Sequence, residues 1–569
     1  MNIASVPAIQ MLHRLMRIHL VIFLAFITAT LHAASHGKRG IVATSQTLAT
    51  QAGVNAMKAG GNAIDAAVAV GLTLSVVDTH NSGIGGGCFI LIRRANGEFI
   101  AIDGREVAPA AATRTMFQQN GKADPALSTT GALASGVPGA LAAYAFAATN
   151  YGRLKLSEII SPAATLARDG FPLDSKYARR LAATASKLKQ FPASAAIVLP
   201  KGRSLKTGDT LVQPDLGRTL SQIAKHGTDW FYRGPFARMT AKWMAANGGI
   251  MTVKDFQNYR VRLRKPVRGS YRGHDIVSFP PPSSGGVHVV QILNILEATK
   301  WNPTNLGVIQ RQHSIAEAMK LAFADRAHWL GDPDFANVPL GLLDKSYARE
   351  LAAQIRPDRT IDVPRHGNPP GALDRLFEKH TTHFSTADDE GNWVSCTATI
   401  NTGFGSKVVI PGTGVFMNNE MDDFSAQPGA PNAFGLIGAE ANAVEPGKRP
   451  LSSMSPTIVL KDKQPVLALG GAGGPTIITQ TAQHIINILD LGMNLDEAIN
   501  APRIHHQWVP DELRIEKRMD ASIIEGLKKL GHKPRSSSTL GVSQIISYDP
   551  NTGFSGVADP RAPGSAAGY

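Results

Sequence analysis

The sequence predicts a layered α/β protein, in which groups of strands lie beside groups of helices. After an N-terminal segment, helical and strand-like patterns alternate along the chain. From residue 382 onward strand-like segments dominate, until a helical pattern begins at Pro475. The chain has 569 residues, of which 43% are hydrophobic, so it can bury a large core. It has no low-complexity tract, heptad run or internal repeat. This mixture favours stacked layers over a helical bundle or a β-sandwich.

The first predicted elements follow the N-terminal segment directly. Residues 45–77 read as two helices separated by Gly-Gly-Asn at 60–62, and residues 85–106 read as a hairpin with its turn at 95–97. Residues 309–332 form an amphipathic helical pattern. The segment around 357–373 is rich in Pro, Gly and Arg and poor in apolar residues, which predicts an exposed, mobile connector.

The remaining elements are mostly strands. Pro475 is well suited to the first turn of the helix that follows them. The expected strands and the helix cover residues 382–388, 393–400, 407–411, 415–419, 456–462 and 465–471, and then 475–492.

The N-terminus resembles a secretory signal. Arg14 and Arg17 precede an apolar run at 18–31, which ends in the small residues Ala33 and Ala34. The run is shorter than the about 20 residues of a bilayer span. We therefore expect residues 1–33 to be removed and the mature protein to be exported, periplasmic or secreted, without stable membrane insertion. The alternative is an uncleaved anchor.

The charge pattern and the cysteine content argue against a nucleic-acid-binding protein and against a disulfide-rich one. The 58 Lys and Arg exceed the 44 Asp and Glu by 14. The clearest basic run, 260–273, places Arg260, Arg262 and Arg264 on one face of a strand without aromatic partners, so nucleic-acid binding is not expected. Only Cys88 and Cys396 occur, each in an apolar run, which favours buried free thiols over a disulfide.

A threonine-rich hairpin is the main chemical signal. The turn ADDEGN at 387–392 separates two segments of period two. Centring the hairpin on Glu390 places Thr381 opposite Thr399, with their Cβ atoms about 5 Å apart. The same register pairs His383 with Thr397 and Ser385 with Ser395. One face then carries Ser395, Thr397, Thr399 and Asn401, and the other carries Val394, Cys396, Ala398 and Ile400.

Two interpretations of this hairpin are open from the pattern alone. One is cross-strand threonine pairing on an exposed sheet face. The other is catalysis, which requires a base to activate a threonine hydroxyl. If the chain is cut before Thr381, the α-amino group of Thr381 can serve as that base.

At this point the sequence resembles the γ-glutamyltranspeptidases, also called glutathione hydrolases. The resemblance is carried by residues 381–405 and by further motifs in family order. These are NSGIGGGCF (81–89), DGRE (103–106), PPPSSGG (280–286), NNEMDDFSAQPGAPN (418–432), GKRPLSSMSPTIV (447–459) and GGAGG (470–474).

The resemblance implies an N-terminal-nucleophile hydrolase fold, a four-layer αββα sandwich formed by both processed subunits. It implies self-cleavage between His380 and Thr381, so that residues 34–380 form a large subunit and 381–569 a small one. The two pieces would remain together as a heterodimer.

The resemblance also assigns roles to site residues. Thr381 would be the nucleophile, with Thr399 hydrogen-bonded to it. A zwitterionic γ-glutamyl head requires a cation for its carboxylate and acids for its ammonium. Gly473 and Gly474 would donate backbone N–H groups to the oxyanion. The residues implied for the carboxylate are Arg105, Ser452 and Ser453, and those for the ammonium are Asn401, Glu420 and Asp423.

Each of these residues also has a structural explanation. Arg105 could form a surface salt bridge, Ser452 and Ser453 a turn before Pro456, and the two glycines a tight strand-to-helix turn. Glu420, Asp422 and Asp423 could hold Ca²⁺, but the spacing is not that of an EF-hand. HExxH and CxxC patterns are absent, so no metal or other cofactor is expected. The glycines of 81–89 precede a strand-like run, which disfavours a nucleotide loop.

One further segment matches relatives, and two residues differ from them. Family members often carry a lid between the acids and the serine pair, and residues 425–448 occupy that place. Phe434 stands where some relatives have a gating tyrosine, so the hydroxyl that this tyrosine would supply is missing at this position. Thr386 replaces the usual aliphatic residue or alanine, near the hairpin turn, where we expect little consequence.

The implied reaction is acyl transfer through a Thr381 ester. Its partners would be glutathione or other γ-glutamyl compounds, with water, amino acids or dipeptides as acceptors. Two alternatives remain: a glutaryl-cephalosporin-type acylase of the same fold, and an exported binding protein that never matures.

Overall fold

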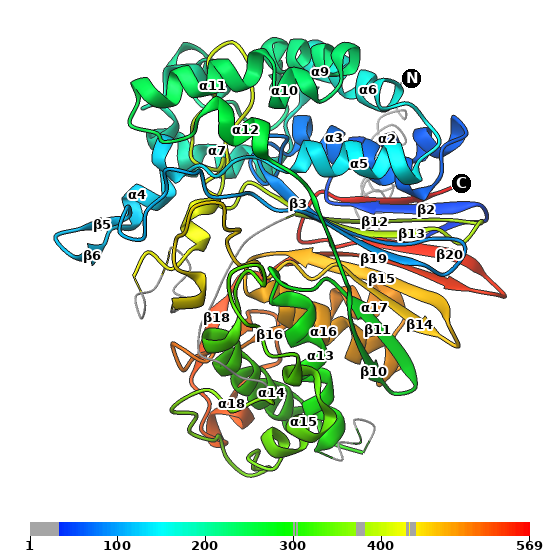
Figure 1. Ribbon diagram of the computed structural model, residues 1–569. Coiled ribbons are helices and arrows are strands. Elements are labelled where there is room, and N and C mark those ends of the chain that lie inside the picture. The colour runs from blue at the N-terminus through cyan, green and yellow to red at the C-terminus, as the bar shows by residue number, and fades with distance from the viewer. Residues whose placement is uncertain (1–33, 300–301, 303–304, 371–381, 428–431, 433–439) are drawn as a thin grey trace, which may run out of the picture.

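The computed structural model describes residues 34–299, 302, 305–370, 382–427, 432 and 440–569. Two seven-stranded sheets are stacked face to face, and helices cover the outer face of each (Figure 1). The layered α/β prediction and the four-layer αββα arrangement implied by the resemblance are confirmed. The predicted signal segment and the predicted cleavage point before Thr381 lie outside the described residues.

The first sheet contains the threonine-rich hairpin at its centre. Its strand order is β21-β2-β12-β13-β3-β4-β9, and every neighbouring pair is antiparallel. The strands are β2 (Gly40–Thr44), β3 (Gly87–Arg93), β4 (Phe99–Gly104), β9 (Arg262–Arg264), β12 (Thr382–Asp388), β13 (Trp393–Thr399) and β21 (Ser565–Gly568).

The second sheet packs against the hairpin through β15. Its order is β1-β20-β19-β15-β14-β11-β10, again antiparallel throughout. The strands are β1 (Ser35–Gly37), β10 (Val267–Tyr271), β11 (His274–Ser278), β14 (Thr457–Lys461), β15 (Gln464–Ala472), β19 (Val542–Asp549) and β20 (Gly553–Ala558). Small sheets are formed by β5 (Gln118–Gln119) with β6 (Lys122–Ala123), β7 (Phe171–Pro172) with β8 (Thr210–Leu211), and β16 (Ile504–His505), β17 (Leu513–Glu516) and β18 (Pro534–Ser537).

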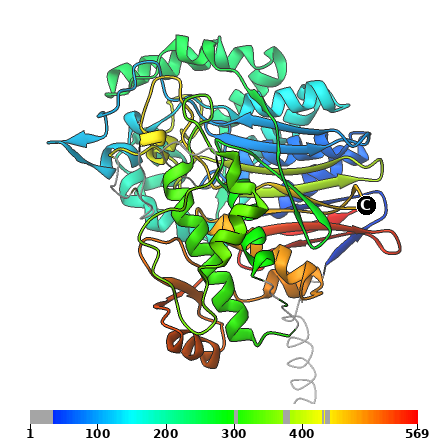
Figure 2. The same ribbon diagram turned by 60° about the horizontal axis from the view of Figure 1, so that its bottom comes forward.

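Helices form the two outer layers. Figure 1 shows α2, α3, α5 and α6 above the first sheet and α13, α14 and α16 below the second. With the bottom turned forward, Figure 2 shows the green and orange helices of that lower layer in front of the strands. The upper group comprises α2 (Thr47–Lys58), α3 (Ala63–Val77), α4 (Pro125–Thr129), α5 (Ala140–Tyr151), α6 (Leu156–Asp169), α7 (Ser175–Leu188), α8 (Pro192–Val198), α9 (Pro214–His226), α10 (Asp229–Tyr232), α11 (Pro235–Ala246) and α12 (Val253–Asn258). The lower group comprises α13 (Gly285–Ala298), α14 (Val308–Trp329), α15 (Lys345–Ala352), α16 (Thr476–Leu489), α17 (Leu495–Asn500) and α18 (Ala521–Lys529).

The break between the first two helices has a local cause. Gly60 has a φ of 94°, which ends α2, and Asn62 caps the N-terminus of α3 by accepting from the backbone of Ile64 and Asp65. The Asp65 side chain accepts in return from Asn62 N–H, which completes a capping box. The predicted pair of helices is thereby confirmed.

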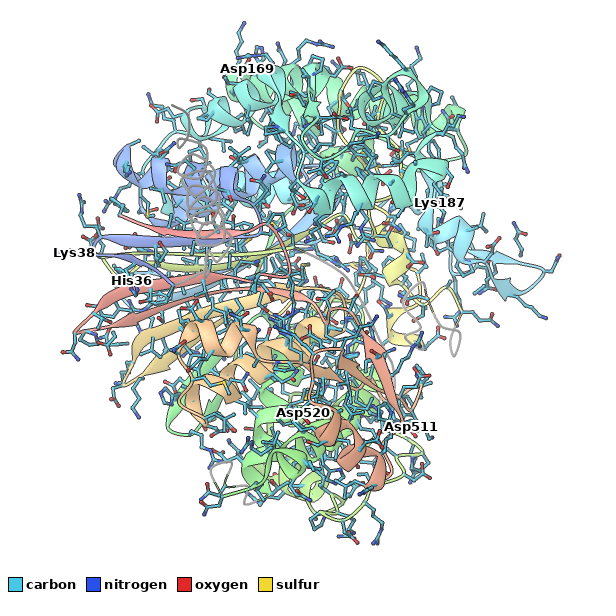
Figure 3. The ribbon with its side chains drawn as sticks, turned by 180° about the vertical axis from the view of Figure 1, so that it is seen from behind. His36, Lys38, Asp169, Lys187, Asp511 and Asp520 are labelled. Atoms are coloured by element: carbon cyan, nitrogen blue, oxygen red, sulfur yellow. The ribbon has the colours of Figure 1, made fainter. Side chains whose placement is uncertain are left out.

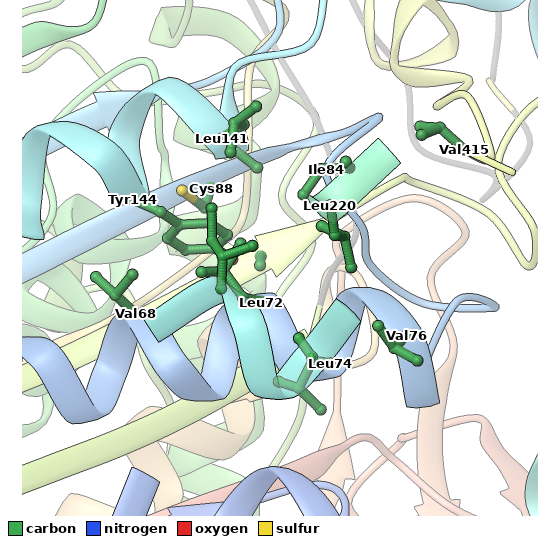
Figure 4. Packing of buried hydrophobic residues seen from close by; sticks show 14 of the residues in the cluster. Val68, Leu72, Leu74, Val76, Ile84, Cys88, Leu141, Tyr144, Leu220 and Val415 are labelled. Carbon is green, nitrogen blue, oxygen red and sulfur yellow. The ribbon is translucent and has the colours of Figure 1, made fainter. Parts of the chain in front are cut away.

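The outer face of the first sheet is apolar. Figure 4 shows Val68 and Leu72 of α3 close to Cys88 of β3 and the ring of Tyr144 on α5. A Cβ at Gly71 would lie 2.5 Å from the Tyr144 ring, so glycine is what lets this ring reach the helix. Cys88 and Cys396 are both buried free thiols, as predicted.

The space between the sheets is partly polar. Phe89 of β3 and Phe279, which directly follows β11, stack there with ring centroids 4.2 Å apart. His383 faces the same space, and a Cβ at Gly470 on β15 would lie 2.5 Å from the His383 ring. Both faces of the threonine-rich hairpin are buried, so an exposed sheet face is the wrong interpretation.

Two expectations about strands are wrong. Residues 407–411 and 415–419 form no strand and share only an isolated bridge between Val409 and Phe416. Glycines between them take positive φ values, 76° at Gly412 and 69° at Gly414, so the chain turns too tightly for a ladder to continue.

Pro475 is the cap of α16 rather than part of its first turn.

The described part of the connector is mostly exposed, as predicted, and hydrogen bonds attach it to the rest of the fold. Ile361 N–H donates to Glu317, Gly367 N–H donates to Asp325, and the Trp508 indole donates to Val363 C=O. These partners could not be read from composition because they come from α14 and from the C-terminal part of the chain. The helix α14 is confirmed, but half of its polar residues are buried and the others are only partly exposed, so it has little solvated face.

No helix among the described ranges combines the length and the apolar character that a bilayer span requires.

Candidate active site

The hairpin has the predicted register. His383 pairs with Thr397 and Ser385 with Ser395. The predicted nucleophile Thr381 lies outside the described residues, as does its pairing with Thr399. Thr399 itself is completely buried, and its Oγ1 accepts from Asn401 N–H at 2.7 Å. From Thr382 onward, β12 is therefore part of a tightly paired, buried ladder.

Thr382, the first described residue of β12, is held from the helical side. Its Oγ1 donates to Asp78 Oδ2 at 3.2 Å and lies 3.3 Å from Ser45 Oγ. Burial raises the pKa of Asp78 to about 6, against the opposing effect of Lys176. Asp78 is the C-terminal cap of α3, so this helix end fixes the position of the strand. Asp78 was not predicted as a site residue, because no local motif in the sequence marks it.

Arg105 lies at the end of β4 and is completely buried. Its guanidinium donates to the carboxylates of Glu420 and Asp423 and also to the carbonyls of Pro450 (2.9 Å) and Leu451 (3.1 Å). A surface salt bridge is therefore the wrong interpretation of this arginine. The site residues Arg105, Glu420 and Asp423 are brought together from two segments of the sequence that are more than 300 residues apart.

The charges in this cluster are strongly coupled. Burial by itself would lower the pKa of Arg105, but Glu420, Asp423 and Glu106 outweigh it and raise that pKa above its usual range. Burial raises the pKa of Glu420 well above its usual range and that of Glu106 to about 7, while Arg105 opposes both shifts. Three carboxyls share one guanidinium, so the cluster favours an additional bound cation. Glu106 was missed as a member, although it directly follows Arg105.

Asn401 is placed beside the acids by a strained loop. Its φ is 70°, an uncommon value for a residue other than glycine, and its Nδ2 donates to Asn419 C=O at 2.9 Å. Its Oδ1 is buried and accepts no hydrogen bond from the described residues, and the same is true of Glu420 Oε2. Buried acceptors that lack donors among the described residues suit a ligand ammonium.

The serine pair is positioned by a loop from elsewhere in the chain. Ser452 and Ser453 are completely buried. Ser284 N–H and Oγ both donate to Ser452 C=O, at 2.7 and 2.8 Å, and Ser452 N–H donates to Pro282 C=O at 2.7 Å. The Ser453 hydroxyl has no hydrogen-bond partner among the described residues. The motif PPPSSGG, which had no assigned role, thus holds the serine loop in place.

Gly473 and Gly474 connect β15 to α16 with positive φ values of 131° and 65°. A Cβ at Gly473 would lie 2.6 Å from the Thr476 hydroxyl and 2.7 Å from the Cα of Gly541. The tight strand-to-helix turn therefore requires glycine, which is the structural explanation given for these residues from the sequence. The geometry also leaves successive backbone amides at a helix start, where an anion can be bound.

The described part of the predicted lid is held near the acids by Asn432, whose Nδ2 donates to Asp422 C=O at 3.4 Å, and by Asn442. Asn442 Nδ2 donates to Asp423 C=O and its Oδ1 accepts from Leu451 N–H. Phe434 lies outside the described residues. Thr386 donates to Ala63 C=O at 2.7 Å, so its hydroxyl is satisfied inside the helical layer.

Taken together, the described residues form a buried site with both signs of charge. A guanidinium lies beside three carboxyls, and an amide oxygen, a carboxylate oxygen and a hydroxyl lack partners. In an α-amino acid the carboxylate and the ammonium are attached to the same carbon, so groups that bind them must be neighbours. Arg105 directly contacts Glu420 and Asp423, so a cation for the carboxylate and acids for the ammonium are neighbours in this site.

The comparisons with known proteins agree with this geometry. The family model described as gamma-glutamyltranspeptidase matches residues 49–569. The glutathione hydrolase proenzyme of Escherichia coli (strain K12) is 46% identical over 528 residues, covering 92% of this chain and 91% of that protein. The glutathione hydrolase proenzyme of Pseudomonas sp. (strain A14) is 43% identical over 562 residues, covering 95% and 96%.

Solved structures show the same fold. The cephalosporin acylase of Bacillus halodurans superposes with a TM-score of 0.85 at 31% identity, covering 94% of this chain and 97% of that one. A chain of the γ-glutamyltranspeptidase of Helicobacter pylori covers 58% of this chain and 95% of its own length, with a TM-score of 0.56 at 42% identity. On the extent of these matches, the chain belongs to the γ-glutamyltranspeptidase family of enzymes, which have the N-terminal-nucleophile hydrolase fold.

Proposed function

We propose that this protein is a self-processing γ-glutamyl hydrolase and transferase that acts on glutathione and related γ-glutamyl compounds. The observation that carries the proposal is the buried contact of Arg105 with Glu420 and Asp423, together with Asn401 Oδ1 and Ser453 Oγ, which have no hydrogen-bond partner among the described residues. This donor and acceptor set suits the α-carboxylate and α-ammonium of a γ-glutamyl head. The names of the two proenzyme relatives support the same activity.

The binding roles follow from the charges. Arg105 and the Ser452 and Ser453 hydroxyls would bind the substrate carboxylate, since a guanidinium can form two parallel bonds to it. Glu420, Asp423 and Asn401 would bind the ammonium. An incoming zwitterion brings one charge of each sign, so it can enter the cluster without changing its net charge.

Maturation would cut the chain between His380 and Thr381, and the two pieces would remain together. Their association has a physical basis, because β12 and β13 of the smaller piece pair with β2 and β3 of the larger one. Cleavage would expose the α-amino group of Thr381 and leave a two-chain enzyme. We keep the removal of residues 1–33 and export as part of the same proposal.

The reaction would then proceed in two acyl transfers. Thr381 Oγ1 attacks the γ-carbonyl carbon while its α-amino group takes the hydroxyl proton. Gly473 and Gly474 stabilise the oxyanion, and the amide C–N bond breaks as the amine leaves with that proton. Water, an amino acid or a dipeptide attacks the resulting ester, which releases glutamate or a new γ-glutamyl amide and restores the Thr381 hydroxyl.

A glutaryl-cephalosporin-type acylase is the second candidate, favoured by the high TM-score with the cephalosporin acylase. A glutaryl group lacks the α-ammonium, which would leave Glu420 Oε2 and Asn401 Oδ1 buried without a donor. Such unpaired groups cost about 1–3 kcal/mol each. The polar set therefore favours the γ-glutamyl substrate.

Two measurements test the proposal. Denaturing electrophoresis should show two fragments, the smaller beginning Thr-Thr-His-Phe, and Thr381→Ala should remain uncut. Hydrolysis rates on γ-glutamyl and glutaryl anilides should favour the γ-glutamyl compound. A faster glutaryl rate would establish the acylase instead, and one uncut, inactive chain would indicate a binding protein.

A further inference from the structure

A second polar cluster lies outside the active site, on the helical layer below the second sheet. It consists of His313 and Glu317, one turn apart on α14, and His532, which follows α18. Their candidate ligand atoms all lie within 4.8 Å of one another. The three side chains are buried, with exposed fractions of 0%, 0% and 6%. Buried groups of this kind require partners, because water does not reach them.

The His313 ring is oriented as a metal ligand would be. Its Nε2 lies 2.6 Å from Arg356 C=O, and since a carbonyl can only accept, Nε2 carries the hydrogen. In the neutral ring Nδ1 is then a bare lone pair, and it faces His532 Nε2 at 2.8 Å. A ring N–H that donates to a carbonyl while the opposite nitrogen points at a second ligand is the usual arrangement around a bound metal.

Glu317 presents to the same place one oxygen that accepts no hydrogen bond from the described residues. Its Oε2 accepts from Ile361 N–H at 2.8 Å, which fixes the carboxylate. Its Oε1 is buried and accepts no hydrogen bond from the described residues, although Lys320 Nζ lies 3.3 Å away. Lys320 also contacts Asp511 at 3.3 Å and Ile361 C=O at 3.1 Å, so it keeps two partners if Oε1 binds a cation.

We propose that His313, Glu317 and His532 form a binding site for one divalent transition-metal ion of the Zn²⁺ type. Two imidazole nitrogens and one carboxylate oxygen suit Zn²⁺ and leave a position for water. Tetrahedral Zn²⁺ with bonds of about 2.0–2.1 Å separates its nitrogen ligands by about 3.3 Å. The two rings would therefore have to move apart by only about 0.5 Å, and Glu317 would turn Oε1 inward.

The position of the site indicates a structural role for the ion rather than a catalytic one. Along α14, the 13 residues from His313 to Arg326 span about 20 Å, and Arg326 is the residue that contacts Ser284 at the serine loop. The ion would thus lie far from the reacting atoms. Figure 3 labels Asp511, which borders this cluster, in the lower helical layer and far from Lys187 in the upper one.

The ion would connect segments on either side of the proposed cut. His313 and Glu317 precede residue 381, whereas His532 follows it, and Arg356 and Ile361 begin the connector that leads to the cut. A metal here would hold the two pieces together after processing. This clamping role rests on the proposed maturation, but metal binding itself does not depend on it.

The test compares the parent protein with a His313→Gln/His532→Gln double variant. Glutamine can retain hydrogen bonds to Arg356 C=O and between the two positions, but it is a poor ligand for Zn²⁺. Exposed His226→Gln on α9 controls for binding to surface histidines. Each protein is loaded with ZnCl₂, passed over a desalting column, and analysed for metal by plasma mass spectrometry.

The parent and His226→Gln should retain one Zn²⁺ more per chain than the double variant, with fragment pattern and turnover unchanged. Co²⁺ in place of Zn²⁺ should give visible absorption bands in the parent and not in the double variant. At free Zn²⁺ about 100 times the Kd, the parent Tm should rise by about 2–4 °C. Equal metal retention in the parent and the double variant, with no Zn²⁺-dependent Tm shift, would overturn the site. A bound ion in a chain that is never cut would keep the site and refute only the clamping role.

Discussion

Arg105 and Glu420 form an ion pair in which both side chains have no exposed surface. Residues 105 and 420 would belong to different pieces after the proposed cut, so the pair would join the two subunits at the substrate site. A buried pair of this kind is costly to break, because the remaining charge has no water to replace its partner.

Arg105→Lys should impair substrate binding more than folding. Lysine keeps the positive charge but loses the two-pronged contact with carboxylates. We expect kcat/KM on a γ-glutamyl anilide to fall by about 100-fold or more, equivalent to about 3 kcal/mol. Steady-state kinetics measure this, and Arg262→Lys, at an exposed position of β9, is the matched control. A change below about threefold in Arg105→Lys would exclude a direct role.

Glu420→Gln should change the preference between substrates. The amide oxygen can still accept from Arg105, but the negative charge that would face the ammonium is removed. The ratio of kcat/KM for γ-glutamyl over glutaryl anilide should fall by about 10-fold or more, since hydrogen bonds to charged groups contribute about 1.5–3 kcal/mol. An unchanged ratio would show that Glu420 does not contact the ammonium.

Gly470→Ala should destabilise the contact between the two sheets. Its Cβ would lie 2.5 Å from the His383 ring, which is itself buried against Thr397 and Ser385. Overpacking of this kind costs about 1–3 kcal/mol. Urea unfolding measures the loss, and Gly307→Ala, where the nearest atom is 3.7 Å away, is the control. Equal stability of the two variants would contradict the close packing of His383 against β15.

His383 should make the protein sensitive to acid. Burial lowers its pKa to about 3, whereas in the unfolded chain it is about 6.5. Between these values only the unfolded state takes up the proton, so the contribution of His383 to stability is present above pH 6.5 and is lost as pH falls. Urea unfolding should show that the parent loses about 2 kcal/mol more than His383→Gln between about pH 6.5 and pH 5. Equal losses in the two proteins would exclude this source of acid sensitivity.

Cys88 and Cys396 should both be titratable thiols, but only after unfolding. Burial raises the pKa of the Cys88 thiol well above its usual range, with Cys396 as a neighbour, so little thiolate is available. A disulfide reagent should find almost no reactive thiol in the native protein and two in denaturant. A disulfide between them, detected by mass spectrometry without reductant, would contradict the structure.

The threonine-rich hairpin shows how far local patterns reach. Alternation and one turn motif gave both strands and the register that pairs His383 with Thr397. They could not indicate that the hydroxyl-bearing face is buried against β15, because β15 lies more than 60 residues further along the chain. The contact is seen at Ser395, whose Oγ donates to Leu469 C=O of β15. Polar alternation has the same pattern whether the opposing surface is water or a second sheet.

The α14 helix gives the complementary case. Its period predicted a helix correctly, yet His313, Glu317 and Asp325 are buried because the connector and the C-terminal segments cover them. No periodicity within the helix contains that information. The cluster with His532 was missed for the same reason, since only one pair of its members is close in sequence.

The sequence by itself determined the layered α/β class, the helices within 45–77, 309–332 and 475–492, the strands of the two predicted hairpins, the hairpin register and the set of motifs that mark the family. These features depend on neighbours along the chain, whose spacing is fixed by backbone geometry. Only the tertiary structure decided that Arg105 contacts Glu420 and Asp423, that Ser284 holds the serine loop, and that His313 faces His532. Such contacts join segments that are distant in sequence, and they form because buried charges and hydrogen-bonding groups must find partners inside the folded core.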